Sequence, residues 1–64
     1  MTYEIREFFG TRGKGHVLQT ATDIDSAISF LEELGRVAYA ARDPENDAAD
    51  VLLVNGAQYT VEPA

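Results

Sequence analysis

Hydrophobic and polar residues alternate along the first segment of the chain. In Thr2–Phe9, Tyr3 and Ile5 point one way, and the polar residues between them point the other way. This period of two is typical of a β-strand with one buried face. Phe8 and Phe9 are adjacent and break the alternation, so we expect the strand to end or to bulge there.

A glycine-rich loop and a second strand follow. Residues 10–16 hold three glycines in seven positions, which is typical of a loop. His16–Ala21 alternates again, and its pattern puts Val17 and Gln19 on one face and Leu18 on the other. The sequence therefore predicts a hairpin with a long tip.

A helical period begins after Thr22, which is predicted to be the N-cap. Asp23 and Asp25 place negative charge at the positive end of the helix dipole, and Gly35 is expected to end the helix. A helix this short needs a sheet beneath it to be stable in water. The apolar positions recur with spacings of three and four and form one stripe, comprising Ile24, Ala27, Ile28, Leu31 and Leu34.

Three further strands are predicted after the helix. Arg36–Arg42 alternates, with Val37, Tyr39 and Ala41 on one face, and the proline and acids of Asp43–Asp50 interrupt it. Val51–Val54 is wholly apolar, and the Asn-Gly pair after it is typical of a two-residue type I′ hairpin turn. The last strand is then expected over residues 57–62.

This order of elements, ββαβββ, indicates the fold class. Short strands joined by hairpins predict an α+β two-layer sandwich, in which a mostly antiparallel sheet of about five strands carries one helix on one face. Residues 1–64 are interpreted as a single small domain. One helix covers only one face of such a sheet, so the other face is expected to be polar or to contact another protein.

Composition narrows the classes of function. The chain has 11 acids and 5 bases and a net charge of −6, which disfavours direct binding to nucleic acid or to an anionic membrane surface. There is no cysteine, so disulfide and thiol chemistry are absent and a reducing, cytoplasmic location is expected. The apolar runs are far shorter than the ~20 residues that span a bilayer, and early charges are unlike a signal peptide.

Two loops resemble ligand-binding motifs without matching them. The glycine-rich loop, which also carries Arg12 and Lys14, lacks the serine or threonine and the helix that a phosphate loop requires. In the acidic loop 43–50, Ala48 stands where a calcium loop needs glycine. We therefore predict neither a cofactor nor a metal site. The loops are interpreted as a basic and an acidic contact segment.

Catalysis is not expected. His16 is the only histidine, and Ser26 and Ser29 lie on the outer face of the predicted helix, away from a strained turn. A chain of 64 residues also has little volume in which to form a substrate pocket.

Charged loops and tyrosines are the candidate contact residues. Exposed acids accelerate association with a basic protein, and tyrosine is a frequent interface anchor. Val51–Val54 is apolar on both faces, so an apolar stripe is expected on the uncovered face of the sheet. The candidate partner-binding residues are Asp43, Glu45, Asp47, Asp50, Arg12, Lys14, Tyr39 and Tyr59.

Three functions stay open. The first is a non-catalytic, acidic protein-binding module that inhibits a basic, nucleic-acid-handling protein stoichiometrically. In size, charge and fold class the chain is similar to compact immunity proteins and phage-encoded inhibitors. The second is a structural homodimer that uses the uncovered sheet face. The third is a binder of a small ligand or nucleotide through the glycine-rich loop.

Overall fold

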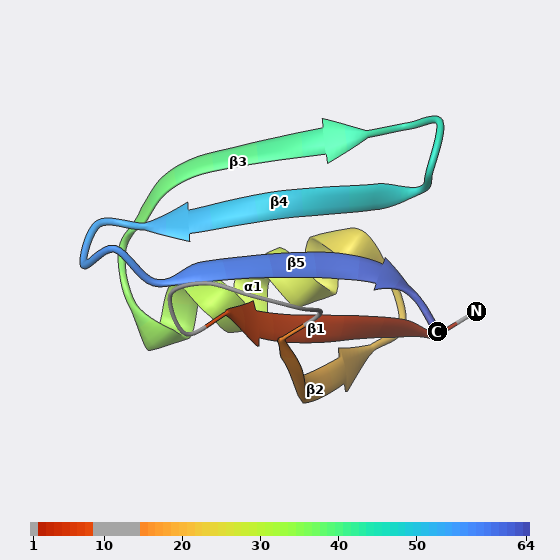
Figure 1. Cartoon of the computed structure of the whole chain (residues 1–64), viewed down its shortest axis with the longest axis horizontal. Helices are drawn as coiled ribbons and strands as arrows, with labels where there is room; N and C mark the ends of the chain where they lie inside the picture. The colour runs from red at the N-terminus through yellow and green to blue at the C-terminus, as the bar shows by residue number, and fades with distance from the viewer. Residues whose placement is uncertain (1, 9–14) are drawn as a thin grey trace.

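The computed structural model describes residues 2–8 and 15–64. All strand pairings in this part of the chain are antiparallel, and they form one sheet with the order β2-β1-β5-β4-β3 (Figure 1). The predicted α+β sandwich is therefore confirmed. Its elements are β1 (Tyr3–Phe8), β2 (His16–Ala21), α1 (Ile24–Leu34), β3 (Val37–Asp43), β4 (Ala48–Leu53) and β5 (Gln58–Pro63).

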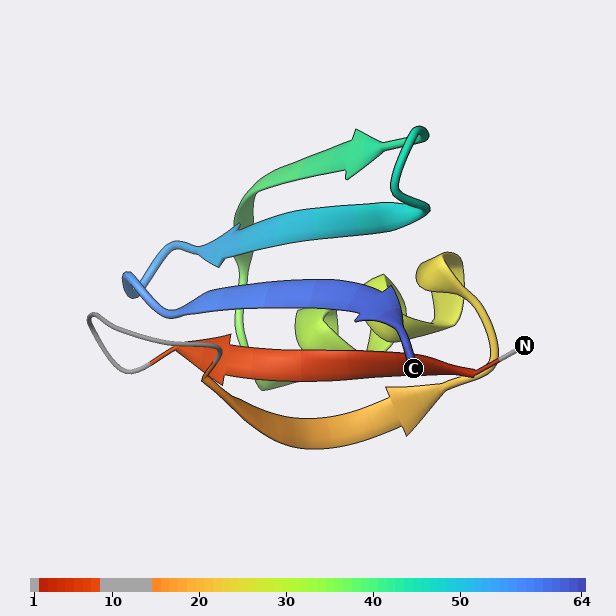
Figure 2. The same cartoon turned by 45° about the vertical axis from the view of Figure 1, so that its right-hand side comes forward.

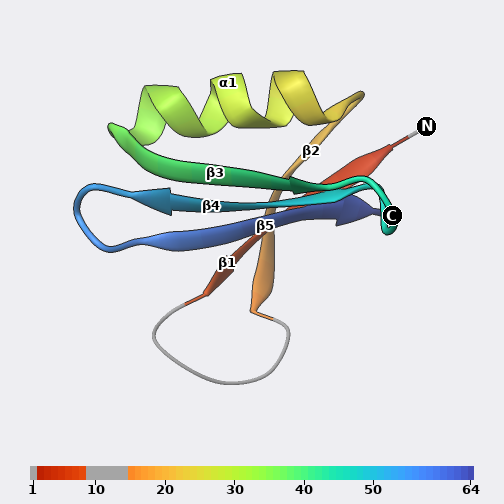
Figure 3. The ribbon, with the colours of Figure 1, turned by 90° about the horizontal axis from the view of Figure 1, so that it is seen from above.

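The helix lies against one face of the sheet. Figures 1 and 2 view the sheet from the opposite side, with α1 behind it, and Figure 3 shows from above that α1 lies on one side. We call the side turned away from α1 the open face. No helix or strand of the described residues covers it.

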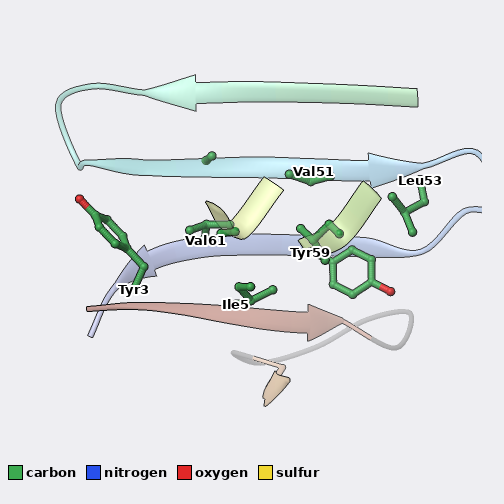
Figure 4. Close-up of a cluster of buried hydrophobic side chains, with 9 residues drawn as sticks. Tyr3, Ile5, Val51, Leu53, Tyr59 and Val61 are labelled. Atoms are coloured by element: carbon green, nitrogen blue, oxygen red, sulfur yellow. The ribbon is translucent and has the colours of Figure 1, made fainter. Parts of the chain in front are cut away.

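The core fills the space between α1 and the sheet. Alternate positions of β1, β4 and β5 supply most of it, and six of these side chains are labelled in Figure 4. The prediction that the helical stripe is buried is correct for Leu31, which is fully buried. It is wrong for Leu34, whose side chain is 49% exposed. Phe30 rather than Leu34 packs against the core. The buried cluster comprises Tyr3, Ile5, Ala27, Leu31, Ala49, Val51, Leu53, Tyr59 and Val61.

The N-cap of α1 is Asp23, so the prediction of Thr22 was wrong. The Asp23 backbone is extended (φ −156°, ψ 170°), and its Oδ1 accepts a hydrogen bond from the Ser26 backbone N–H at 2.7 Å. Aspartate caps at least as well as threonine, because its carboxylate also meets the positive end of the helix dipole. Gly35 ends the helix as predicted, and its N–H donates to the Leu31 carbonyl at 3.2 Å.

The acidic loop is shorter than predicted, because β4 already begins at Ala48. The turn between β3 and β4 is residues 44–47. The Asp43 carboxylate holds it by accepting hydrogen bonds from the Glu45 backbone N–H at 3.1 Å and from Asn46 Nδ2 at 2.6 Å. Asp47 completes the turn with a φ of 53°, a conformation that aspartate tolerates better than most residues.

Residues 54–57 join β4 to β5, and three of them, 54–56, lie between the hydrogen-bonded Leu53 and Ala57. The predicted two-residue type I′ turn was therefore wrong. A type I′ turn needs a positive φ at both central residues, and here Gly56 has one (95°) while Asn55 does not. The Gly56 N–H donates to the Leu53 carbonyl, and the Leu53 N–H donates to the Ala57 carbonyl, both at 2.9 Å. Asn55 Oδ1 stabilises this longer loop by accepting the Ala57 N–H at 2.9 Å.

The two outermost strands each contain a bulge that changes which residues share a face. In β3, Val37 pairs with Leu53 but Tyr39 pairs with Leu52, so Ala38 is the extra residue. Val37 therefore faces the helix and Tyr39 the open face, although the sequence pattern put them together. Leu18 is the extra residue in β2.

Candidate functional site

The structure separates the predicted contact residues. Asp43, Glu45 and Asp47 lie in or beside the β3–β4 turn, whereas Asp50 and Tyr39 lie on the open face. Tyr59 lies on the helix side of β5, in the core. The remaining two, Arg12 and Lys14, lie outside the described residues.

Two of the three tyrosines belong to the core. Tyr59 is 5% exposed, and its hydroxyl donates a hydrogen bond to Glu7 Oε2 at 3.1 Å. Burial, followed by this contact with Glu7, raises the pKa of Tyr59. Tyr39, by contrast, is 57% exposed, so it is the tyrosine that offers a ring to a partner.

The acids of the β3–β4 turn mainly stabilise that turn. The hydrogen bond from Asn46 is the main reason that the pKa of Asp43 lies below its ordinary value. Asp47 accepts a hydrogen bond from the Tyr3 hydroxyl at 2.5 Å. Glu45 is exposed and uses its backbone N–H in the turn, so its carboxylate is a solvated surface charge.

One residue from each of four neighbouring strands forms a row across the open face. Phe8 of β1 pairs with Gln58 of β5, Gln58 pairs with Leu52 of β4, and Leu52 pairs with Tyr39 of β3. Side chains of directly paired residues lie on the same face of a sheet. This row, which we call the first row, therefore has an aromatic ring at each end. The two rings are separated by three strand spacings, or about 14 Å.

A second row, two residues along each strand, is more polar. It runs from Arg6 through Thr60 and Asp50 to Ala41. A groove of about 380 Å³ lies along the first row and the middle of the second, where Thr60 and Asp50 stand. Its volume is near the lower end of the range for ligand-binding pockets. The groove is lined by Phe8, Tyr39, Asp50, Leu52, Gln58 and Thr60, and also by Val51 and Tyr59, which lie between them on β4 and β5 and have their side chains in the core.

Some charged side chains of the open face form ion pairs, whereas Asp50 does not. The Arg6 guanidinium lies 2.9 Å from Glu4 Oε1 and 3.7 Å from Glu62 Oε1, so it forms ion pairs with two carboxylates. Thr60 Oγ1 also donates to Glu62 at 3.2 Å. The exposed Asp50 carboxylate forms neither a hydrogen bond nor an ion pair with any residue that the structure describes. Asp50 is thus the acceptor that the groove offers to a ligand.

The described residues do not gather three or more histidine or acidic side chains around a point where a metal ion would fit. Within 2–8 and 15–64, no helix is long and apolar enough to cross a membrane.

Sequence reasoning named Tyr39, Asp50 and Tyr59 as candidate contact residues, and it expected an apolar stripe from Val51–Val54 on the uncovered face. It did not identify Phe8, Gln58 or Thr60. These residues alternate with the buried residues along their strands. That alternation was the signal in the sequence that could have identified them. No known family model matches this chain, and searches of curated proteins and of solved structures likewise found no match.

Proposed function

We propose that this protein is a non-catalytic binding module that docks a basic protein onto its open face. The groove carries this proposal, because it places an exposed aromatic ring and an uncompensated carboxylate on a sheet face that no helix or strand of residues 2–8 and 15–64 covers. Aromatic side chains that are exposed on a small domain are typical anchors of protein interfaces.

The charge of the molecule favours a basic partner. The chain carries a net charge of −6, and within the described part of the open face Glu4, Asp50 and Glu62 outnumber Arg6. Such a field accelerates encounter with a positive surface and repels negative ones. A protein that handles nucleic acid has this kind of surface, because it must neutralise phosphates. A module bound there excludes the nucleic acid, which is stoichiometric inhibition.

Affinity capture at low and high salt tests this function. Immobilised wild-type protein is compared with Tyr39→Ser, which removes the exposed anchor, and with Glu45→Gln, which removes an exposed charge outside the groove. We expect wild type and Glu45→Gln to retain the same basic protein at an equimolar ratio. We expect Tyr39→Ser to lose it, and high salt to weaken it. Equal capture by Tyr39→Ser contradicts the proposal.

A homodimer through the open face is the second candidate, and the exposure of Val17 (42%) and Tyr39 (57%) favours it. Both residues lie on the open face, Val17 opposite Arg6 and Tyr39 opposite Leu52. Ligand binding through the glycine-rich loop concerns residues that lie mostly outside the described ones, and it stays a prediction.

A further inference from the structure

We propose that the groove accepts an arginine side chain of the partner protein, with the guanidinium stacked on Tyr39 and hydrogen-bonded to Asp50. This inference rests on the proposed function and names the chemistry of the contact.

The aromatic part of the site is the exposed ring of Tyr39, with Phe8 at the far end of the same row. A guanidinium is planar and weakly hydrated, so it stacks on aromatic faces and is attracted by their negative π-surface. Leu52 lies between the two rings and contacts the apolar stem of such a side chain.

The carboxylate of Asp50 is within reach of a guanidinium that stacks on Tyr39. Asp50 lies two residues before Leu52 on β4, and Leu52 pairs with Tyr39, so Asp50 and Tyr39 are diagonal neighbours across an antiparallel pair. Diagonal neighbours lie roughly 7–8 Å apart, and long side chains span that distance. One guanidinium therefore meets both the ring and the carboxylate.

The remaining acceptors favour arginine over lysine. Gln58 and Thr60 also line the groove, and Thr60 pairs directly with Asp50. Each carries a side-chain oxygen that can accept an N–H. Arginine has five N–H donors in a fixed plane and bonds a carboxylate in two places, whereas lysine is a compact point charge. An arginine side chain therefore donates hydrogen bonds to more of these acceptors at once than a lysine side chain does.

Charge also argues against a second copy of this chain as the occupant. On the described open face the cation available to a second copy is Arg6, and it already pairs with Glu4 and Glu62. Two copies placed face to face bring their Asp50 carboxylates together, which is repulsive.

A capped peptide, acetyl-Gly-Arg-Gly-amide, is the probe, because the guanidinium is its only charge. It is titrated into ¹⁵N-labelled protein by NMR, in parallel with the corresponding lysine and glutamine peptides. We expect shifts at the amides of Tyr39, Leu52 and Gln58, several-fold tighter binding of the arginine peptide than of the lysine peptide, and no binding of the glutamine peptide. We expect Asp50→Asn and Tyr39→Leu each to weaken binding at least fivefold, and Glu45→Gln, the matched charge control, to leave it unchanged.

Equal binding of the arginine and lysine peptides, or shifts confined to the turn residues 44–47, overturns the inference. The amide spectrum of each variant reports its fold in the same experiment, and Tyr39→Leu decides the matter if Asp50→Asn does not fold. The proposed function is tested separately by the captured partner. If Asp50→Asn still captures it and Tyr39→Ser does not, the arginine site is wrong and the binding face is right.

Discussion

The hydroxyl of Tyr3 donates a hydrogen bond to Asp47 Oδ2 at 2.5 Å, which joins the first strand to the β3–β4 turn across 44 residues of sequence. Tyr3 is 8% exposed, and Asp47 adopts a positive φ of 53°. The contact holds the acidic turn against the body of the protein. It also occupies the carboxylate of Asp47, and hydrogen bonds from Glu45 and Asn46 occupy that of Asp43, so both acids have structural roles.

The tyrosines predict destabilisation at alkaline pH. The hydrogen bond to Asp47 raises the pKa of Tyr3, and burial raises that of Tyr59. Groups with a raised folded pKa stabilise the protein fully below the unfolded pKa of about 10, and this contribution is lost as pH rises through the folded value. We expect the phenolate absorbance of native protein to develop at higher pH than in urea, and Tyr3→Phe to reduce the difference. A native curve that coincides with the unfolded one contradicts this assignment.

Leu31 is expected to be essential to the core. It is fully buried, so Leu31→Ala loses transfer free energy and leaves a cavity, at a cost of about 2–5 kcal/mol. Leu34, on the same helix but 49% exposed, is the matched control, and Leu34→Ala should cost much less. Urea denaturation measures both. A loss below ~1 kcal/mol for Leu31→Ala contradicts a position for this side chain in the core.

The N-cap of α1 predicts that the folded protein loses stability at acid pH. Hydrogen bonds from Ser26, its backbone N–H first, hold the pKa of Asp23 below its ordinary value. A lowered folded pKa gives stability that is present above the unfolded pKa and lost as pH falls through the folded one, here below about pH 4. We expect Asp23→Ala to lower the urea midpoint at neutral pH and to flatten the acid dependence. Thr22→Ala should change both less than Asp23→Ala does, because the Thr22 hydroxyl makes a weaker contribution to the lowered pKa of Asp23 than Ser26 does. An equal effect of the two variants would restore Thr22 as the cap.

The protein is expected to be monomeric at high micromolar concentration, because the open face is acidic. Sedimentation equilibrium measures the mass directly, and the melting temperature of a monomer does not change with protein concentration. A dimer that Tyr39→Ser dissociates supports the homodimer in place of the binding module.

Periodicity was sufficient to predict the order of the elements and most of the core. The pattern of β1, with Tyr3 and Ile5 in phase, put both in the core, and the helical stripe correctly identified Ala27 and Leu31. Periodicity failed in β3, where the extra residue Ala38 reversed the face of every residue after it. The bulge left no mark in the hydrophobic pattern, because Val37 and Tyr39 still alternate in the sequence with the small residues Ala38 and Ala40.

The groove was harder to predict, because it depends on which strands are neighbours. Phe8 and Gln58 are 50 positions apart in the chain and meet because β5 inserts between β1 and β4. No local signal specifies that insertion. Tyr39 was identified from its residue type alone, and its position on the open face follows from the bulge.

The bulges at Leu18 and Ala38 also affect how the protein behaves at high concentration. Both fall in the outermost strands, β2 and β3, the strands that a further chain would have to join. An added strand requires an evenly spaced ladder of donors and acceptors, and in β3 the regular stretch is only Tyr39–Asp43. Growth into cross-β fibres is therefore opposed at both ends of the sheet, although the centre of β3 is alanine-rich and uncharged. Strand addition at either edge is thereby disfavoured, which supports the proposal that a partner docks on the open face.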